Sequence, residues 1–266
     1  MKKYYPIIAI VVIALGWWYI ASFTQPKIAP DGYKNATYVI NGENLTLVNG
    51  HAEKEIVPGS ASKLITQYFG NEAVGDLNGD GLSDIAFLLT QSGGGSGTFY
   101  YAVAALQTPN GYTGTNGILL GDKIAPQNTE IRDGKIIVNY ADRKPSEPMT
   151  TPPSIGVSKY LKVDNGNLLE FITNATYMCK DEKTIQAEFY KGGTIPVKPG
   201  EMPIPTGKVF LKLSDGRAMT LPQTISASGA RYANTDESIV FWNKGNTAFI
   251  AENNVETYSD CVTPGN

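Results

Sequence analysis

The chain has 266 residues, of which 42% are hydrophobic and 18% are charged, a composition typical of globular proteins and long enough for two domains. Its formal net charge is −3, and the sequence contains no block of lysine and arginine residues. A nucleic-acid-binding surface needs clustered cations to displace counterions from phosphates, so nucleic acid is excluded as a partner.

Residues 1–23 read as a membrane or export signal. Lys2 and Lys3 precede an apolar run from Ile7 to Phe23. At about 1.5 Å per residue, a helix over this stretch just spans a bilayer core of about 30 Å. The pattern predicts a single-pass transmembrane anchor with its N-terminus in the cytoplasm and everything after Thr24 outside it. The alternative is a cleaved signal peptide, which would leave a secreted or periplasmic protein.

Residues 24–33 are polar and contain Pro26 and Pro30, which is typical of an extended linker. Residues 34–171 then predict an α+β domain. Apolar residues in the segment 61–69 fall at helical spacing, which predicts one short helix. The rest of this domain predicts strands and hairpins at 38–40, 45–48, 84–90, 98–106, 135–143 and 158–171, with an irregular loop at 145–154.

An acidic loop lies inside this first domain. Residues 76–84 read DLNGDGLSD, and oxygen ligands at alternating positions of a tight loop favour Ca²⁺. The stretch resembles the Asp-rich calcium loops of the FG-GAP or VCBS type, although those normally recur in a chain and this one occurs once. The resemblance implies a structural Ca²⁺ site, and the alternative is a set of Asx turns without a metal. The ligands would be Asp76, Asn78, Asp80, the carbonyl of Leu82, and Asp84.

Residues 172–266 differ from the first domain because they consist of short strand-like segments without a helix signal. In the segment KVFLKL, Val209, Leu211 and Leu213 alternate with other residues and define one apolar face. Seven or eight such segments at regular spacing predict a small antiparallel barrel or sandwich. They are 177–180, 184–190, 208–213, 217–221, 229–234, 238–242, 246–252 and 255–260.

Cys179 and Cys261 are the two cysteines of the chain; Cys179 lies in the first of these segments, and Cys261 directly follows the last. Because disulfides persist in oxidising compartments, an extracytoplasmic location favours a bridge that seals the barrel. In the chain-entropy model, a bridge that closes so long a loop stabilises the fold by roughly 4 kcal/mol. Two buried free thiols are the alternative.

Four elements of residues 177–262 carry a resemblance to a known family. The cysteine in the first segment, LPQTISASGARYAN, SIVFWNKGNTAFI and the final YSDC together resemble the membrane-bound inhibitors of C-type lysozyme, a family of bacterial periplasmic or lipid-anchored domains. The resemblance implies an eight-stranded antiparallel barrel with a Cys179–Cys261 bridge. It also implies a protein partner, a C-type lysozyme whose substrate cleft the barrel would plug.

In that family, a Ser-Gly-x-x-Tyr element and a Lys-Gly hairpin tip form the inhibitory face. In this sequence they fall on Ser228, Gly229 and Tyr232, and on Lys244 and Gly245. A lysozyme cleft holds one protonated and one ionised carboxyl group. A lysine ammonium suits the ionised group, and a serine hydroxyl both donates and accepts hydrogen bonds. The alternative is that both elements are ordinary solvated turns.

Two features depart from the family. The segment ANTDES, residues 233–238, is longer than the family pattern, so it would either displace Lys244 relative to Ser228 or bulge outward. Its Asp236 and Glu237 are expected to add negative charge beside the cationic tip. The family's usual anchor is a lipidated cysteine, whereas here the apolar N-terminal run would take that role.

An enzyme is the class that the sequence favours least. His51 is the single histidine, and beside an Asn-Gly step it is expected in an exposed turn. The sequence shows no assembled nucleophile or acid–base pair. The preferred hypothesis is an anchored, extracytoplasmic lysozyme inhibitor. The alternative is a cell-envelope binding or scaffold module whose barrel does not inhibit.

Overall fold

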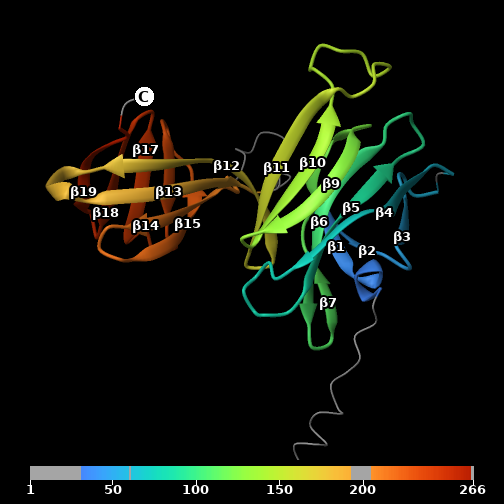
Figure 1. Ribbon diagram of the computed structural model, residues 1–266, viewed down its shortest axis with the longest axis horizontal. Coiled ribbons are helices and arrows are strands. Elements are labelled where there is room, and N and C mark those ends of the chain that lie inside the picture. The colour runs from blue at the N-terminus through green and yellow to red at the C-terminus, as the bar shows by residue number, and fades with distance from the viewer. Residues whose placement is uncertain (1–30, 60, 193–204, 265–266) are drawn as a thin grey trace, which may run out of the picture.

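The computed structural model describes residues 31–59, 61–192 and 205–264. Within these residues the chain forms nineteen β-strands and two short 3-10 turns, η1 (Gly32–Asn35) and η2 (Lys180–Glu182). Figure 1 shows two bodies, a β-sandwich and a β-barrel, with strand β12 (Asn167–Met178) running from one into the other. The molecule is therefore built almost entirely from strands.

The predicted α+β fold of the first domain is wrong. The segment 61–69, predicted as a helix, belongs to strand β4 (Lys63–Gly75), and the described part of the chain contains no α-helix. β4 pairs with β3 (His51–Glu55) on one side and with β5 (Asp84–Ser92) on the other. These neighbours satisfy the backbone groups that a helix would satisfy internally, and the β-branched and aromatic side chains of the segment suit a strand.

The transmembrane helix predicted at residues 1–23 lies outside the described residues. In the part of the chain that is described, no helix has the length and apolar character needed to cross a membrane. Most of the predicted linker also lies outside this part, but its last residue, Tyr33, is buried in the first domain.

The first domain is a sandwich of two antiparallel sheets around a shared apolar layer. One sheet contains β3 to β8, and the other contains β9 to β11 and the start of β12. Leu88 and Ala102 of the first sheet lie in one buried cluster with Val138 and Leu161 of the second. The remaining strands of the two sheets are β6 (Phe99–Thr108), β7 (Gly111–Gly114), β8 (Ile118–Asp122), β9 (Ala125–Arg132), β10 (Lys135–Asp142) and β11 (Ile155–Asp164).

The outer face of the first sheet is buried as well. A hairpin of β1 (Thr37–Ile40) and β2 (Glu43–Thr46) covers it together with η1. The ring of Tyr38 lies 5.6 Å from that of Phe87, and the ring of Tyr33 lies 5.4 Å from the same phenylalanine. The central strands β5 and β6 therefore have apolar contacts on both faces.

The second domain is a closed eight-stranded antiparallel barrel, as predicted. Neighbouring strands pair in chain order from β13 to β19, and β12 pairs with both β13 and β19 to close the ring. Alternate side chains point inward, so that Ile185, Leu211 and Phe241 form part of one buried core. The strands are β13 (Thr184–Lys191), β14 (Lys208–Leu213), β15 (Ala218–Thr224), β16 (Ala230–Ala233), β17 (Ile239–Lys244), β18 (Thr247–Glu252) and β19 (Val255–Val262).

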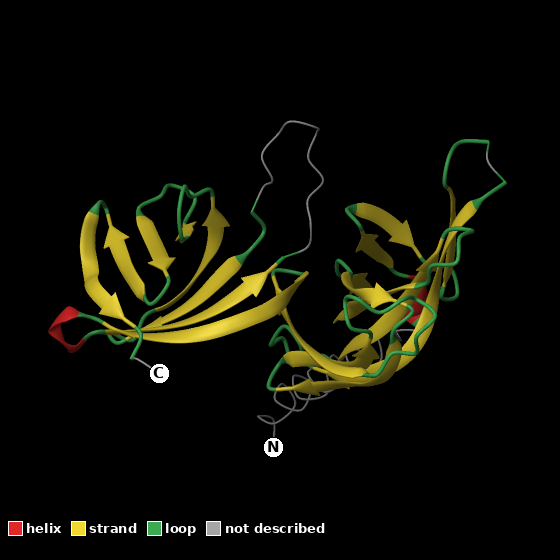
Figure 2. Ribbon diagram, turned by 90° about the horizontal axis from the view of Figure 1, so that it is seen from above, coloured by secondary structure: helices red, strands yellow, loops and turns green. Residues whose placement is uncertain are grey.

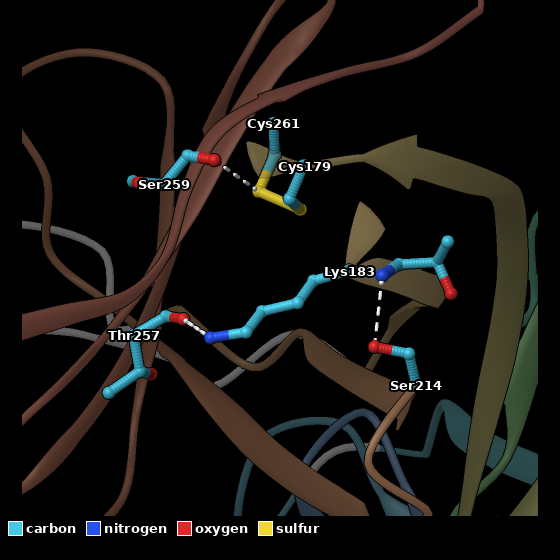
Figure 3. Close-up of a disulfide and its surroundings, with 7 residues drawn as sticks. Cys179, Lys183, Ser214, Thr257, Ser259 and Cys261 are labelled. Carbon is cyan, nitrogen blue, oxygen red and sulfur yellow. Dashed lines mark hydrogen bonds between the residues drawn. A yellow bond between two sulfur atoms is a disulfide. The ribbon is translucent and has the colours of Figure 1, made fainter. Parts of the chain in front are cut away.

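A disulfide joins Cys179 to Cys261 at the closing seam, which confirms the predicted bridge. β12 and β19 pair through one residue pair, Met178 opposite Val262. Figure 3 shows the bridge and, near it, Lys183, whose Nζ donates to the carbonyl oxygen of Thr257 at 2.9 Å. The covalent link therefore completes a seam that backbone pairing closes at a single point.

β12 continues through the predicted domain boundary at 171/172, where a β-bulge shifts its register with β13. Figure 2 shows the long strands that leave the barrel toward the sandwich. Within the sandwich, the side chain of Asn116 exchanges two hydrogen bonds with the backbone of Leu168 in the first part of β12, at 2.7 and 3.1 Å. Lys208 of the barrel forms an ion pair with Asp164 of the sandwich. The two domains are thus joined by a strand and by contacts beside it.

Aromatic rings continue this junction on the outer surface of the sheet. The ring of Tyr190 lies 5.5 Å from that of Phe171 and 5.0 Å from that of Phe210, both edge to face. Lys162 lies over the Phe210 ring, with its Nζ 3.7 Å from the centroid. Burial at this junction lowers the pKa of the Lys162 ammonium.

Candidate functional site

The Ser228 and Lys244 turns leave the barrel at the same end. Ser228 lies between β15 and β16, and Lys244 ends β17. Because β16 and β17 are antiparallel with Ala230 opposite Asn243, the residue before Ala230 comes to lie beside Lys244. That residue is Gly229. We call residues 225–229 and 244–247 the tip turns.

Close packing holds the tip turns together. Gly229 has a φ of +68°, and a Cβ at this position would stand 2.5 Å from the Asn243 carbonyl oxygen and 3.1 Å from Lys244 Cβ. Glycine alone combines this backbone conformation with so close an approach. The indole Nε1 of Trp242 also donates to the carbonyl oxygen of Ser228 at 3.1 Å. The two turns therefore form one structural unit.

The functional groups of the tip turns are free. Ser228 and Lys244 are both exposed. Within the described part of the chain, Ser228 Oγ and Lys244 Nζ form no hydrogen bond or ion pair, whereas Lys54 and Arg217 are paired with carboxylates. A hydroxyl and an ammonium are thus presented on adjacent turns at one end of the barrel.

Gly245 and Tyr232 lie in different surroundings. Gly245 is exposed at the hairpin tip with a φ of +55°, and a Cβ there would meet nothing within 4 Å. Tyr232 is only 5% exposed, and its ring lies 6.1 Å from that of Phe241 in the barrel core. Burial raises the pKa of its hydroxyl. Tyr232 therefore lies beneath the surface that the other four residues share.

The lengthened segment 233–238 lies at the opposite end of β17 from Lys244. A strand of six residues, at about 3.3 Å per residue, separates them. Glu237 turns back to Arg231, with an ion-pair distance of 2.9 Å. The expectation that Asp236 and Glu237 place negative charge beside the cationic tip is therefore wrong. The segment extends the far turn and leaves the pairing of β16 with β17 in register.

Two residues beside the tip turns were not identified from the sequence. Trp242 stacks on Phe249, with ring centroids 5.5 Å apart, and this stacking fixes the indole that contacts Ser228. Ile225 begins the first tip turn and is 60% exposed. An isolated isoleucine in the polar run TISASG was a signal for an exposed apolar contact residue. Trp242 could not be assigned because its face depends on strand register.

The predicted calcium loop is held by its own hydrogen bonds. Both carboxylate oxygens of Asp76 accept backbone N–H groups of the loop, which holds the pKa of this carboxyl below its usual range. Asp80 accepts from the side chain of Asn78 and from the backbone N–H of Leu82. Asp84 is fully buried and accepts two backbone N–H groups, and its burial raises its pKa.

This arrangement adds no support to the calcium prediction. Among the described residues, no three histidine, cysteine, aspartate or glutamate side chains are grouped so that they could hold a metal ion. The loop oxygens are occupied by the Asx turns that were the alternative to a metal site. A Ca²⁺ site in residues 76–84 therefore stays a prediction from the sequence.

His51 is the first residue of β3 and does not lie in a turn as expected. Its Nε2 lies 3.1 Å from a carboxylate oxygen of Glu53, and both side chains are exposed. Lys63 contacts the same glutamate from β4. The histidine belongs to a surface ion-pair cluster at the edge of the first sheet, remote in sequence from the tip turns.

Comparisons with known proteins point to the barrel. Residues 177–258 match the family model described as membrane-bound lysozyme-inhibitor of c-type lysozyme. The chain is 48% identical over 54 residues to the membrane-bound lysozyme inhibitor of C-type lysozyme from Yersinia enterocolitica serotype O:8. This alignment covers 20% of the chain and 44% of the relative, so the chain spans less than half of that relative's length. No solved structure matches the chain.

The matched family is one of inhibitors rather than enzymes, and its model covers the barrel and the tip turns. The family resemblance of residues 177–262 is thereby confirmed for most of that range. The sandwich domain lies outside the family match.

Proposed function

We propose that the barrel inhibits a C-type lysozyme by inserting the tip turns into the enzyme's substrate cleft. One observation carries the proposal. A free hydroxyl on Ser228 and a free ammonium on Lys244 lie on adjacent turns within the region that matches the inhibitor family. The rigid barrel beneath them keeps the two groups in a fixed relation, which lowers the entropy lost on binding.

The chemistry of the two groups suits a lysozyme cleft. Such a cleft contains an ionised carboxylate and a carboxylic acid of raised pKa. The Lys244 ammonium would pair with the carboxylate where little water remains, and the Ser228 hydroxyl would bond either protonation state of the acid. In this proposal Tyr232 supports the first tip turn from inside the barrel and does not touch the enzyme.

The disulfide supports an extracytoplasmic location for the barrel. Cys179 and Cys261 are joined, and such bridges persist in oxidising compartments. C-type lysozyme acts on cell walls outside the cytoplasm, so inhibitor and enzyme would share a compartment. We infer that the barrel works in the cell envelope or outside it.

An inhibition assay with the full chain tests the proposal. The chain should slow cell-wall lysis by a C-type lysozyme at micromolar concentration. Lys244→Ala should weaken inhibition by about 2–5 kcal/mol, because the enzyme's carboxylate would be left buried without a partner. Lys212→Ala, an exposed lysine at the other end of the barrel, is the matched control and should inhibit like the parent chain.

Ser228→Ala should weaken inhibition by about 1.5–3 kcal/mol, because it removes one hydrogen bond to a charged or acidic group. A chain that leaves lysozyme fully active would reject the proposal and favour an envelope-binding module with a non-inhibitory barrel. Full inhibition by Lys244→Ala would instead show that another surface of the barrel binds the enzyme.

A further inference from the structure

One side of β12 is only partly paired. β12 pairs with β13 on one side over most of its length. On its other side it pairs with β11 up to Glu170 and with β19 at Met178. Within the described part of the chain, residues 171–177 have no strand partner on that side. We call this stretch the free edge of β12.

The free edge is exposed, and its one irregularity is a β-bulge at Ile172 in the pairing with β13. Ile172 is 54% exposed, and Thr173, Asn174 and Thr176 are exposed as well. An unpaired strand edge presents a row of N–H and C=O groups that another chain can pair with, and proteins usually block such edges with lysine, proline or a covering segment. The sequence of the free edge, FITNATY, contains neither lysine nor proline.

A pocket of about 750 Å³ opens beside the free edge. Its aromatic floor is formed by Tyr177, Phe189 and Tyr232, which are buried in the barrel. The buried Oδ1 of Asn243, in the pocket wall, has no hydrogen-bond partner among the described residues. A pocket of this size can hold an apolar side chain on its aromatic floor, and the polar side chains of its wall, such as Asn174, Gln223 and Asn246, can hydrogen-bond a ligand around it.

The charge around the pocket is one-sided. No aspartate or glutamate is among the described residues that line it, and Lys191 lies at its rim. Lys191 is exposed and, within the described residues, forms no ion pair. Its cross-strand neighbour Glu170 is occupied by Lys159 at 2.7 Å. The pocket therefore favours a ligand that carries a carboxylate near its edge.

We propose that the free edge of β12 binds an extended peptide segment of a protein partner. The segment adds a strand in the gap between β11 and β19, places one apolar side chain in the aromatic pocket and directs an acidic group toward Lys191. Backbone hydrogen bonds supply affinity in this mode of recognition, and the pocket supplies specificity. The pocket shares Gly245 and Asn246 with the second tip turn, but the free edge of β12 contains no tip-turn residue, so peptide binding there does not require that the tip turns inhibit a lysozyme.

A random decapeptide phage library panned on the full chain provides the probe. The selected peptides should have alternating apolar residues and one acidic residue. Synthetic versions should slow amide hydrogen exchange within residues 171–177. N-methylation of alternate residues on the peptide face that pairs with β12 should abolish binding, and methylation on the opposite face should leave it intact. Failure to select any peptide, or binding that is indifferent to both methylation patterns, would overturn the proposal.

Two matched variants locate the site. Ile172→Asp should weaken binding of the synthetic peptide at least about tenfold. The new carboxylate would lie on the free edge and beside the pocket, where it would repel the acidic group of the peptide. Val255→Asp makes the same change at an exposed strand position at the other end of β19 and should bind normally. Equal binding by both variants would contradict the proposal.

Sedimentation velocity without peptide tests the alternative that a second copy of the chain, rather than a peptide, covers the free edge. The parent chain should sediment as a monomer at the concentrations used for binding. Self-association that Ile172→Asp removes would show that a second copy of the chain covers the free edge, and it would overturn the peptide proposal.

Discussion

The barrel and the sandwich bury their cores in different ways. Each barrel strand has one buried face, so that apolar and polar residues alternate, as in β14 with Val209, Leu211 and Leu213 inside. The central strands of the sandwich are covered on both faces, and six consecutive residues of β5 are buried. Alternation therefore reveals the inward face of a barrel strand from sequence, whereas a doubly covered strand shows only a continuous apolar run.

The two regions also close their sheets differently. The barrel returns to its starting strand and is sealed by Cys179–Cys261. The sandwich relies on a separate hairpin, β1–β2, to cover its outer face. The barrel depends on a covalent link and the sandwich depends on a covering hairpin, so we expect mutations in the two domains to change stability in different ways.

The largest expected effects come from one core residue in each domain. Phe241→Ala in the barrel and Leu88→Ala in the sandwich each remove a side chain that is fully buried, and each should lower the free energy of unfolding by about 3–5 kcal/mol. Urea unfolding measures both when it is followed by far-ultraviolet circular dichroism and by tryptophan fluorescence, with Trp17 and Trp18 replaced by phenylalanine so that the fluorescence reports on Trp242.

Because β12 joins the two cores, we expect each substitution to shift both probes together. Separate shifts, with fluorescence responding to Phe241→Ala alone, would show that the strand does not couple the domains. Lys212→Ala serves as the surface control and should shift neither.

Replacing both Cys179 and Cys261 by serine should lower the stability of the barrel by roughly 2–4 kcal/mol, because the long loop that they close regains its entropy when the chain unfolds. Thermal unfolding with and without a reducing agent is the measurement. The parent chain should respond to reduction and the double variant should not. A parent chain that melts at the same temperature in both conditions would show that the seam does not need its covalent link.

Asp84→Asn tests the buried carboxylate of the sandwich. Asp84 accepts backbone N–H groups at 2.9 and 2.8 Å through its two oxygens. An amide nitrogen would face one of these donors, so the variant should lose about 1–3 kcal/mol of stability. Asp215→Asn in the barrel, where the carboxylate is exposed, is the comparison and should lose less. Urea unfolding of the two variants gives the ranking.

If the predicted calcium site exists, Ca²⁺ should stabilise the sandwich and leave the stability of the barrel unchanged. A site in residues 76–84 would raise the stability of the sandwich by about 1 kcal/mol at a free Ca²⁺ concentration five times the dissociation constant. Calorimetric titration of the full chain measures the binding. Absence of heat at millimolar Ca²⁺ would dispose of the site, and Asp76→Asn should abolish any heat that is seen.

The smallest expected effects are those of pH on two aspartates with opposite shifts. Arg217 lowers the pKa of Asp215 from 3.8 to about 2, so its contribution to stability is present above 3.8 and is lost as the pH falls toward 2. Burial raises the pKa of Asp84, so its contribution is present below 3.8 and is lost as the pH rises through its folded-state pKa.

Carboxyl chemical shifts followed by NMR between about pH 1 and about pH 7 report both groups directly, because this range extends to both sides of ordinary aspartate titration and below the lowered pKa of Asp215. If the pKa values of Asp215 and Asp84 were displaced in the same direction from that of an ordinary aspartate, the result would contradict the assignment of Asp215 to a surface ion pair and of Asp84 to a buried hydrogen-bond acceptor.

Much of the barrel could be predicted from the sequence because its signals are local. Alternation in β14 and the Asp215-Gly216 and Lys244-Gly245 turns each indicate a feature without reference to distant residues, and the bridge could be predicted because the chain has two cysteines. The tip residues Ser228 and Lys244 were found through a family resemblance, and their proximity required the register of β16 with β17.

The sandwich was predicted less well because its signals are not local. Residues 64, 65, 68 and 69 are apolar at helical spacing, yet pairing with β3 and β5 places them in a strand. β9, which had no clear pattern, is held by its pairing with β10. Strand partners that are distant in sequence decide the secondary structure of such segments, and a short window of sequence contains no information about those partners.

By itself, the sequence determined the barrel, its disulfide and the residues that occupy its two tip turns, because strand alternation and turn chemistry are encoded over short stretches and two cysteines allow a single pairing. Tertiary structure alone decided that β12 serves both domains, that Tyr232 turns inward and that residues 171–177 lack a strand partner on one side among the described residues. Those features follow from which strands become neighbours, and neighbours in a sheet are chosen by the packing of the whole chain.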